Sequence, residues 1–183
     1  MTSDEPGVLP PPDYPWYRTV SDKSMEQGDL LFNFPSVTVT STYDQITSEE
    51  VYFDLAYYDA ILLSQSCDLA VGKIENVILC PVFSREELAP KFKGLESSKS
   101  ETQIQNGKWP SLYLLPPCRV KVLDLETRIV NFRQVLTVPI EVLADHLMHQ
   151  EPRVRLSPPY REHLAQAFAR FIMRIGFPLD FRT

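Results

Sequence analysis

The sequence predicts a mainly β fold with flanking helices (α+β): a small, strongly bent antiparallel sheet or barrel with an amphipathic C-terminal helix. Two observations predict it. Many short apolar runs rich in β-branched residues are separated by turn residues, which is typical of antiparallel strands. The clearest helical pattern lies near the C-terminus. At 183 residues, with 44% hydrophobic and 23% charged residues, the chain is long enough for one packed domain.

The composition narrows the function classes. A net charge of −6 disfavours broad binding to phosphate backbones, although residues 151–183 carry +3 and the first 150 residues −9. Three cysteines at wide spacings, with no zinc-binding pattern, predict reduced thiols and no metal. No apolar run approaches the length of a membrane span, so we expect a cytoplasmic protein without membrane contact or cofactor.

Prolines divide the chain. Five of them fall within residues 1–15, where proline fixes φ and removes an amide donor, so residues 1–20 are predicted to form an extended arm. Residues 21–183 are predicted to form a single domain. The polar stretch near 84–108 is expected to be a helical and loop insertion in it.

The first half of the domain is predicted to contain several strands. Gly28 supplies a bend into a first strand that Pro35 ends. Residues 37–42 and 51–55 are read as two further short strands, separated by a polar turn. Residues 59–64 form the central strand, whose aliphatic side chains we expect to be buried.

The next strand is predicted over residues 77–83, paired with residues 60–64, with Pro81 at a bulge or strand end. Ser84 and Glu87 form a capping-box pattern that predicts a helix start.

Further strands are expected over 109–117 and 135–139, with a short helix after Pro139. Residues 120–125 and 128–132 are read as the two arms of a hairpin.

The C-terminal helix is predicted to begin with Ser157 as N-cap and Pro158 at the first helical position, and to stop at Gly176. Arg170 and Arg174 project from an exposed ridge away from the apolar face. That face consists of Leu164, Phe168, Phe171, Ile172 and Ile175.

Three blocks carry a family resemblance: Gly28-Asp29-Leu30, residues 60–64 and residues 77–82. In this order, with a last helix packed on the sheet, they resemble the MazF/PemK family of endoribonuclease toxins. The resemblance implies an SH3-like barrel and a prokaryotic toxin–antitoxin setting. The family's catalytic Arg and the Pro after it correspond to Tyr58 and Asp59 here, so the resemblance favours the barrel and disfavours the usual nuclease.

Residues that could carry chemistry gather after the central strand. Ser64, Cys67 and Asp68 lie within five residues, and Ser84 stands where the resembling family has a hydroxyl residue after the third block. Cys67 could serve as a nucleophile if the fold brought a histidine to it, as a metal or ligand contact together with Asp68, or as a structural residue of the turn.

A binding role ranks first among the function classes. We expect a non-catalytic protein-binding or regulatory module in a toxin–antitoxin or anti-phage (antiviral) defence system, with a protein partner encoded nearby. The candidate contact residues are Tyr14, Trp16 and Tyr17 near the N-terminus and Arg170 and Arg174 on the last helix. The alternatives are a divergent endoribonuclease that finds its cation elsewhere, for example at Arg85 or Arg133 or among the C-terminal arginines, and a Cys67-dependent hydrolase.

Overall fold

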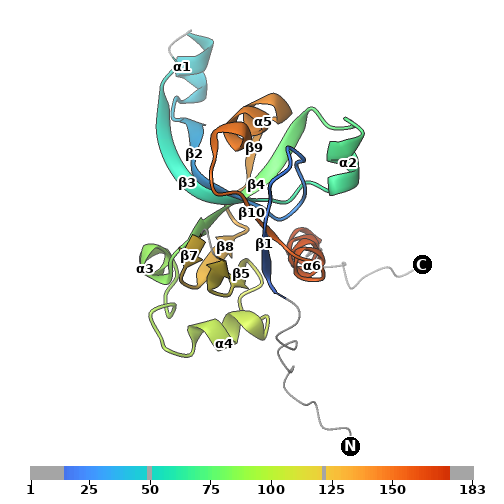
Figure 1. The fold of residues 1–183 in the computed structure, drawn as a ribbon. Helices are drawn as coiled ribbons and strands as arrows, with labels where there is room; N and C mark the ends of the chain where they lie inside the picture. Colours follow the sequence, from blue (N-terminus) through green and yellow to red (C-terminus); the bar gives the residue numbers. More distant parts are fainter. Residues whose placement is uncertain (1–14, 49–50, 121–122, 174–183) are drawn as a thin grey trace, which may run out of the picture.

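Antiparallel strands form the centre of the domain. The computed structural model describes residues 15–48, 51–120 and 123–173. The strands of the main sheet are β1 (Tyr17–Thr19), β2 (Asp29–Val39), β3 (Phe53–Leu62), β4 (Asn76–Phe83), β5 (Leu112–Leu115), β8 (Arg128–Asn131), β9 (Leu136–Pro139) and β10 (Val154–Leu156). They are ordered β1-β10-β2-β3-β4-β8-β5, with β9 also paired to β4 (Figure 1). All pairings are antiparallel, so the prediction of a mainly β fold is confirmed.

Helices lie around this sheet, which is open because β1 and β5 end its order. The described helices are α1 (Tyr43–Thr47), α2 (Ser66–Ala70), α3 (Arg85–Leu88), the 3-10 helix η1 (Ala89–Lys91), α4 (Ser100–Gln105), α5 (Ile140–His149) and α6 (Tyr160–Ile172). Two short strands, β6 (Cys118–Val120) and β7 (Leu123–Leu125), form a separate ribbon. The domain is therefore an α+β fold.

The middle strands are buried on both faces. Successive side chains of a strand point to opposite sides of the sheet, so neighbouring residues enter different cores. Ile61 and Cys80, which face each other on β3 and β4, belong to a core that α6 covers. Leu62 and Leu79 form the next pair and pack on the other side, against Leu147 of α5. The predicted pairing of residues 60–64 with 77–83 is confirmed by this register.

Pro81 lies inside β4, opposite Ala60, and not at the expected bulge or strand end. β4 pairs with β9 up to Leu79 and with β8 from Val82 onward. Pro81 falls between these two ladders, so the missing N–H breaks neither of them.

Two expected strand breaks are absent. Pro35 does not end the first strand, because β10 pairs with β2 at Asp29 and Leu30 and leaves the later part of β2 as an edge, where proline is tolerated. Residues 51–55 and 59–64 likewise contribute to one long strand, β3. The polar turn between β2 and β3 contains α1, whose N-cap Thr42 forms a capping box with Gln45.

The hairpin predicted over residues 120–132 is wrong. β7 pairs with β6, whereas β8 joins the main sheet between β4 and β5. Strand β10, a three-residue strand that pairs with both β1 and β2, was not predicted from the sequence.

Helix α6 begins later than predicted. Ser157 contributes its backbone carbonyl, which accepts bonds from the amides of Tyr160 and Arg161, and not a side-chain cap. Leu164, Phe168 and Phe171 pack on the core as expected. Ile172 is exposed. The predicted Ile175, Arg174 and Gly176 lie outside the described residues.

The stretch near 84–108 contains α3, η1 and α4. It packs on the sheet through a third apolar cluster, in which Leu88, Phe92, Leu95 and Ile104 meet Ile129 of β8. Of the predicted N-terminal arm, residues 1–14 lie outside the described residues, and Tyr17–Thr19 form β1.

Candidate functional site

The polar groups of the turn after β3 form hydrogen bonds with neighbouring elements. Ser64 is buried, and its Oγ accepts a hydrogen bond from the amide of Ile78 at 2.8 Å. The Oγ of Ser66 accepts one from the amide of Gln27 at 3.1 Å, and Gln27 Nε2 donates to the carbonyl of Leu63 at 2.7 Å. These bonds join β3 to β4 and to the turn before β2, so the serines are used structurally.

Cys67 and Asp68 lie on α2, a helix of five residues. The Cys67 thiol is exposed and bonds weakly to Gln65 Oε1 at 3.6 Å and to Asp68 Oδ1 at 3.8 Å. The three histidines lie on α5 and α6, and none in the described part of the chain hydrogen-bonds to Cys67. The structure therefore assembles no thiol–imidazole pair at this turn.

Ser84 is the N-cap of α3, as its capping-box pattern predicted. Its Oγ accepts from the amide of Glu87, whose carboxylate accepts from the amide of Ser84. The Ser84 hydroxyl is therefore used to cap α3.

The N-terminal aromatic residues fasten β1 to the domain. Trp16 stacks on Tyr160 with ring centroids 3.7 Å apart. Tyr17 is buried and donates to the carbonyl of Pro116 at 2.8 Å, so it is a core residue and not the partner contact that we expected. Tyr14 lies outside the described residues.

Arg170 is exposed on α6, and its Nε donates to the carbonyl of Gln166 at 3.3 Å. Arg174, the other half of the predicted ridge, lies outside the described residues.

A buried ion cluster, missed at the sequence level, joins β10, β2 and α6. Arg155 is fully buried, with Nε 2.5 Å from Asp29 Oδ1 and Nη2 3.0 Å from Asp29 Oδ2. Its Nη1 lies 2.5 Å from Glu26 Oε1. Arg153 and Arg161 add contacts to Asp29 and Glu26. Three arginines of the basic C-terminal region are thus neutralised by the acidic body.

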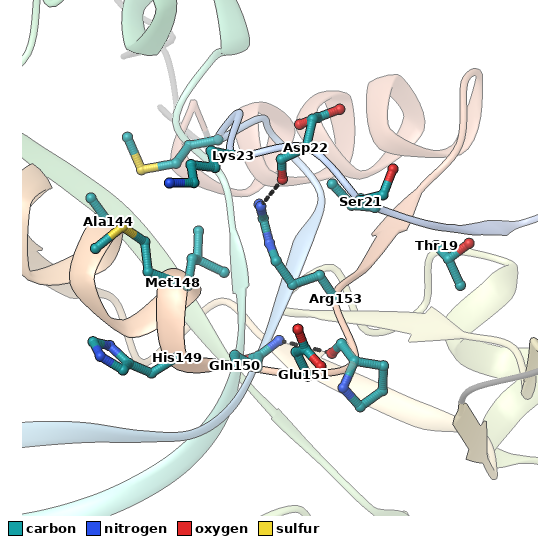
Figure 2. Close-up of a pocket in the computed structure, with 14 residues that line it drawn as sticks. Thr19, Ser21, Asp22, Lys23, Ala144, Met148, His149, Gln150, Glu151 and Arg153 are labelled. Atoms are coloured by element: carbon teal, nitrogen blue, oxygen red, sulfur yellow. Dashed lines mark hydrogen bonds between the residues drawn. The ribbon is translucent and has the colours of Figure 1, made fainter.

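A cleft of about 1070 Å³ lies between the segment after β1 and the end of α5 (Figure 2). Arg153 lines this cleft and donates to the carbonyls of Asp22 and Ser24. Hydrogen bonds from the side chain and amide of Ser24 hold the pKa of Asp22 below its usual value. Gln150 donates to the carbonyl of Leu30 at 2.9 Å. Several polar groups of this cleft thus stabilise the loops that form it.

An arm projects from the sheet, at the upper left of Figure 1. We define the arm as residues 35–48 and 51–57, where β2 and β3 extend beyond their other partners and carry α1 at the tip. Its base is a β-bulge, because Leu31 faces Ala60 whereas Phe34 faces Tyr58, which leaves one extra residue on β2. The bulge contains Asn33, whose backbone has a positive φ of 52°.

The bulge places all the large apolar side chains of the ribbon on one side. Cross-strand partners share a face of a sheet. Val37 pairs with Leu55 and Val39 pairs with Phe53, with polar pairs such as Thr38 and Asp54 between them on the opposite side. The resulting arm face consists of Pro35, Val37, Val39, Phe53, Leu55 and Tyr57.

The arm face is open to solvent. Its five large side chains, all but Pro35, are 53–64% exposed. Five half-exposed side chains of this size leave on the order of 500 Å² of apolar surface in water, as large as the biggest patch on a typical monomer. At the tip, Tyr43 is 80% exposed. The arm therefore carries the main exposed apolar surface of the described residues.

The arm also lies in a segment without positive charge. Between Lys23 and Lys73 the sequence contains eight carboxylates and no Lys or Arg. The absence of Lys and Arg from this segment can be seen in the sequence. The bulge that places the apolar side chains on one face cannot, because it depends on the pairing register of β2 and β3.

A small polar cavity of about 170 Å³ lies at the base of the arm. Asp59, Tyr57, Glu87 and Arg128 are among its lining residues. Asp59 Oδ1 accepts from the amide of Asn33 at 3.0 Å. The Nε of Arg128 is buried and has no hydrogen-bond partner among the described residues.

The sequence matches no protein-family model and no curated protein. In the described ranges, no group of three or more His, Cys, Asp or Glu side chains is placed to hold a metal ion. None of the helices in those ranges has the length and apolar character needed to cross a membrane.

Proposed function

We propose that this chain is a non-catalytic protein-binding module and that the arm face is its docking surface. The observation that supports the proposal is a two-stranded ribbon with five large apolar side chains more than half exposed on one side. Such a ribbon is a poor free-standing structure, since two strands bury little apolar area between them. A partner that covered the face would remove this surface from water.

The charge of the arm indicates the chemistry of the partner. Asp44 and Asp54 lie on the described part of the arm, and Glu49 and Glu50 belong to the same stretch of sequence. A partner with an apolar stripe rimmed by Lys or Arg would therefore match both the face and its surroundings. The docking surface is thus proposed for a basic-rimmed protein.

A second copy of this chain fits the arm face less well. Two arm faces packed together would bury about 1,000 Å² in total, below the roughly 1,200–2,000 Å² of specific interfaces. They would also bring together two segments that each contain four carboxylates and no cation between residues 35 and 57.

The setting of this module follows from the family resemblance. The bent antiparallel sheet is proposed to be a divergent MazF/PemK-like, SH3-like barrel in a cytoplasmic prokaryotic protein. The partner is then the product of a neighbouring gene in a toxin–antitoxin or anti-phage defence locus.

The test compares two neighbouring residues of one strand. Val37 and Thr38 are both exposed on the arm and point to opposite sides, so Val37→Asn and Thr38→Asn form a matched pair. The tagged chain is co-expressed with the products of adjacent genes. We expect a partner retained by the native chain and by Thr38→Asn, and held at least about tenfold more weakly by Val37→Asn, since burying a valine contributes roughly 1.5–3 kcal/mol.

Equal retention by Val37→Asn and the native chain would refute the docking surface. A homodimer that Val37→Asn dissociates would replace the basic-rimmed partner by a second copy.

The small cavity at the base of the arm supports a second candidate function, RNA cleavage. Tyr58 and Asp59 occupy the positions where the resembling family has its catalytic Arg and the following Pro. Arg128 lines the cavity beside Asp59, and its buried Nε has no hydrogen-bond partner among the described residues. A guanidinium there could stabilise the charge that develops on a scissile phosphate.

Purified chain would then degrade RNA, and Arg128→Gln would lose about 100-fold or more of the rate. Arg85→Gln is the matched control, since Arg85 lies on the adjacent α3 and pairs with Glu86 at 3.8 Å. Absence of cleavage by the native chain, or equal loss in both variants, would eliminate this candidate.

A further inference from the structure

Three separate segments bring four cations to one hollow. Lys91 and Lys93 come from the end of η1, Lys108 precedes β5, and Arg133 follows β8. Together with Trp109 they line a cavity of about 330 Å³, the basic hollow. None of the described residues that line it is Asp or Glu.

The aromatic part of the basic hollow is held in place by the third apolar cluster. Phe92 is buried in that cluster, and Trp109 packs against it with ring centroids 6.0 Å apart. The indole Nε1 of Trp109 donates to Gln103 Oε1 at 3.3 Å. The Arg133 guanidinium carbon lies 4.7 Å from the centroid of the Phe92 ring, a cation–π contact that positions this charge.

The four cations of the basic hollow are not neutralised by the protein. In the described ranges no carboxylate forms an ion pair with Lys91, Lys93, Lys108 or Arg133. The three arginines of the buried cluster, by contrast, are all paired. Gathered like charges attract counterions, and a bound polyanion releases those ions.

We propose that the basic hollow binds a single-stranded nucleic-acid segment. Its phosphates lie against Lys91, Lys93, Lys108 and Arg133, and one unpaired base stacks on Trp109. The net charge of −6 does not oppose this, because the negative charge is concentrated between Lys23 and Lys73, in another part of the sequence. A duplex does not fit this chemistry, since its bases are already stacked and paired.

The charge count gives a measurable signature. Four phosphate contacts on a single strand predict a slope of about −3 for log K against log salt, or roughly a 50-fold loss of affinity between 50 and 200 mM salt. Each cation removed lowers the magnitude of that slope by about 0.7.

Fluorescence anisotropy with a labelled oligouridine of about eight nucleotides, within the usual site size of single-strand binders, measures both quantities on the full chain. We expect Lys108→Gln and Lys93→Gln each to weaken binding and flatten the slope. Lys73→Gln makes the same charge change away from the hollow and is expected to bind as the native chain does. Trp109→Phe is expected to weaken binding without changing the slope.

Several outcomes would overturn the proposal: no saturable binding, an equal loss in Lys73→Gln and Lys108→Gln, or equal affinity for a duplex of the same length. Competition separates two sources of the phosphate. Displacement of the oligouridine by uridine monophosphate at much lower concentration than by inorganic phosphate supports base stacking. Equal displacement by the two would mean that the hollow is a simple anion site, and would overturn the proposal. Val37→Asn is expected to bind the oligouridine normally, which keeps this inference separate from the docking surface.

Discussion

Replacing Asp29 by asparagine removes the carboxylate that faces the buried Arg155 guanidinium. The two side chains are 2% and 0% exposed and are joined by two hydrogen bonds, of 2.5 and 3.0 Å. The amide would preserve the shape of the site but leave the buried Arg155 cation with one carboxylate, Glu26, in place of two. Removing one partner of a buried ion pair costs about 3–5 kcal/mol, so Asp29→Asn is expected to destabilise the domain by that amount.

Thermal and urea unfolding measure this loss. In a chain of this size each kcal/mol lowers Tm by about 2–4 °C, so Asp29→Asn should unfold roughly 6–20 °C earlier. Glu126→Gln is the control, because Arg119 and Glu126 form an ion pair of 2.7 Å in which the side chains are 50% and 80% exposed. An exposed pair is worth less than about 1 kcal/mol.

A change of less than about 1 kcal/mol in Asp29→Asn would show that Glu26 or water compensates the guanidinium, and would refute the reasoning from burial. The double variant Asp29→Leu with Arg155→Met provides a second check. Removing both charges together is expected to cost far less than removing the carboxylate alone, since the fully buried guanidinium is removed as well and Glu26 keeps Arg161 as a partner.

Three further outcomes follow from single residues. Gly28→Ala is expected to cost about 1–3 kcal/mol in urea unfolding, because φ is 88° and the added Cβ would lie 3.0 Å from a Cβ of β10. Burial raises the pKa of Tyr113 to about 12; the unfolded tyrosine loses its proton near pH 10, so stability should fall between pH 10 and 12, and less steeply in Tyr113→Phe. A thiol reagent should label Cys67 in the native protein, and Cys80 and Cys118 only after unfolding, because Cys67 is exposed, the others are buried, and burial raises the pKa of Cys80 to about 12.

The sequence predicted best what depends on neighbouring residues. The capping box at Ser84 and the buried strand pair, β3 and β4, were found because a local pattern specifies each of them. The long ribbon was missed because a proline such as Pro35 usually ends a strand. Pro35 is tolerated here because β10 no longer pairs with β2 at that position. Strand β10 was missed because three residues that include a buried Arg155 do not look like a core strand.

The candidate sites were harder to predict, because each depends on contacts between distant segments. The turn from Ser64 to Asp68 drew attention through its polar side chains, but the sequence did not reveal that Ser64 bonds to the backbone of β4. The arm face exists because the bulge at Asn33 decides which side Val37 occupies. The basic hollow needs three segments that the sequence separates by up to 42 residues.

Solvent protection of the arm face is the most direct measurement of the docking surface. In a Cys67→Ser background, Val37→Cys and Thr38→Cys place a thiol on the two sides of the same strand, and both should react rapidly in the free chain. With the co-purified partner bound, the account predicts that labelling slows at least about tenfold for Val37→Cys and stays unchanged for Thr38→Cys. Equal labelling of Val37→Cys in the free and bound chain would contradict it.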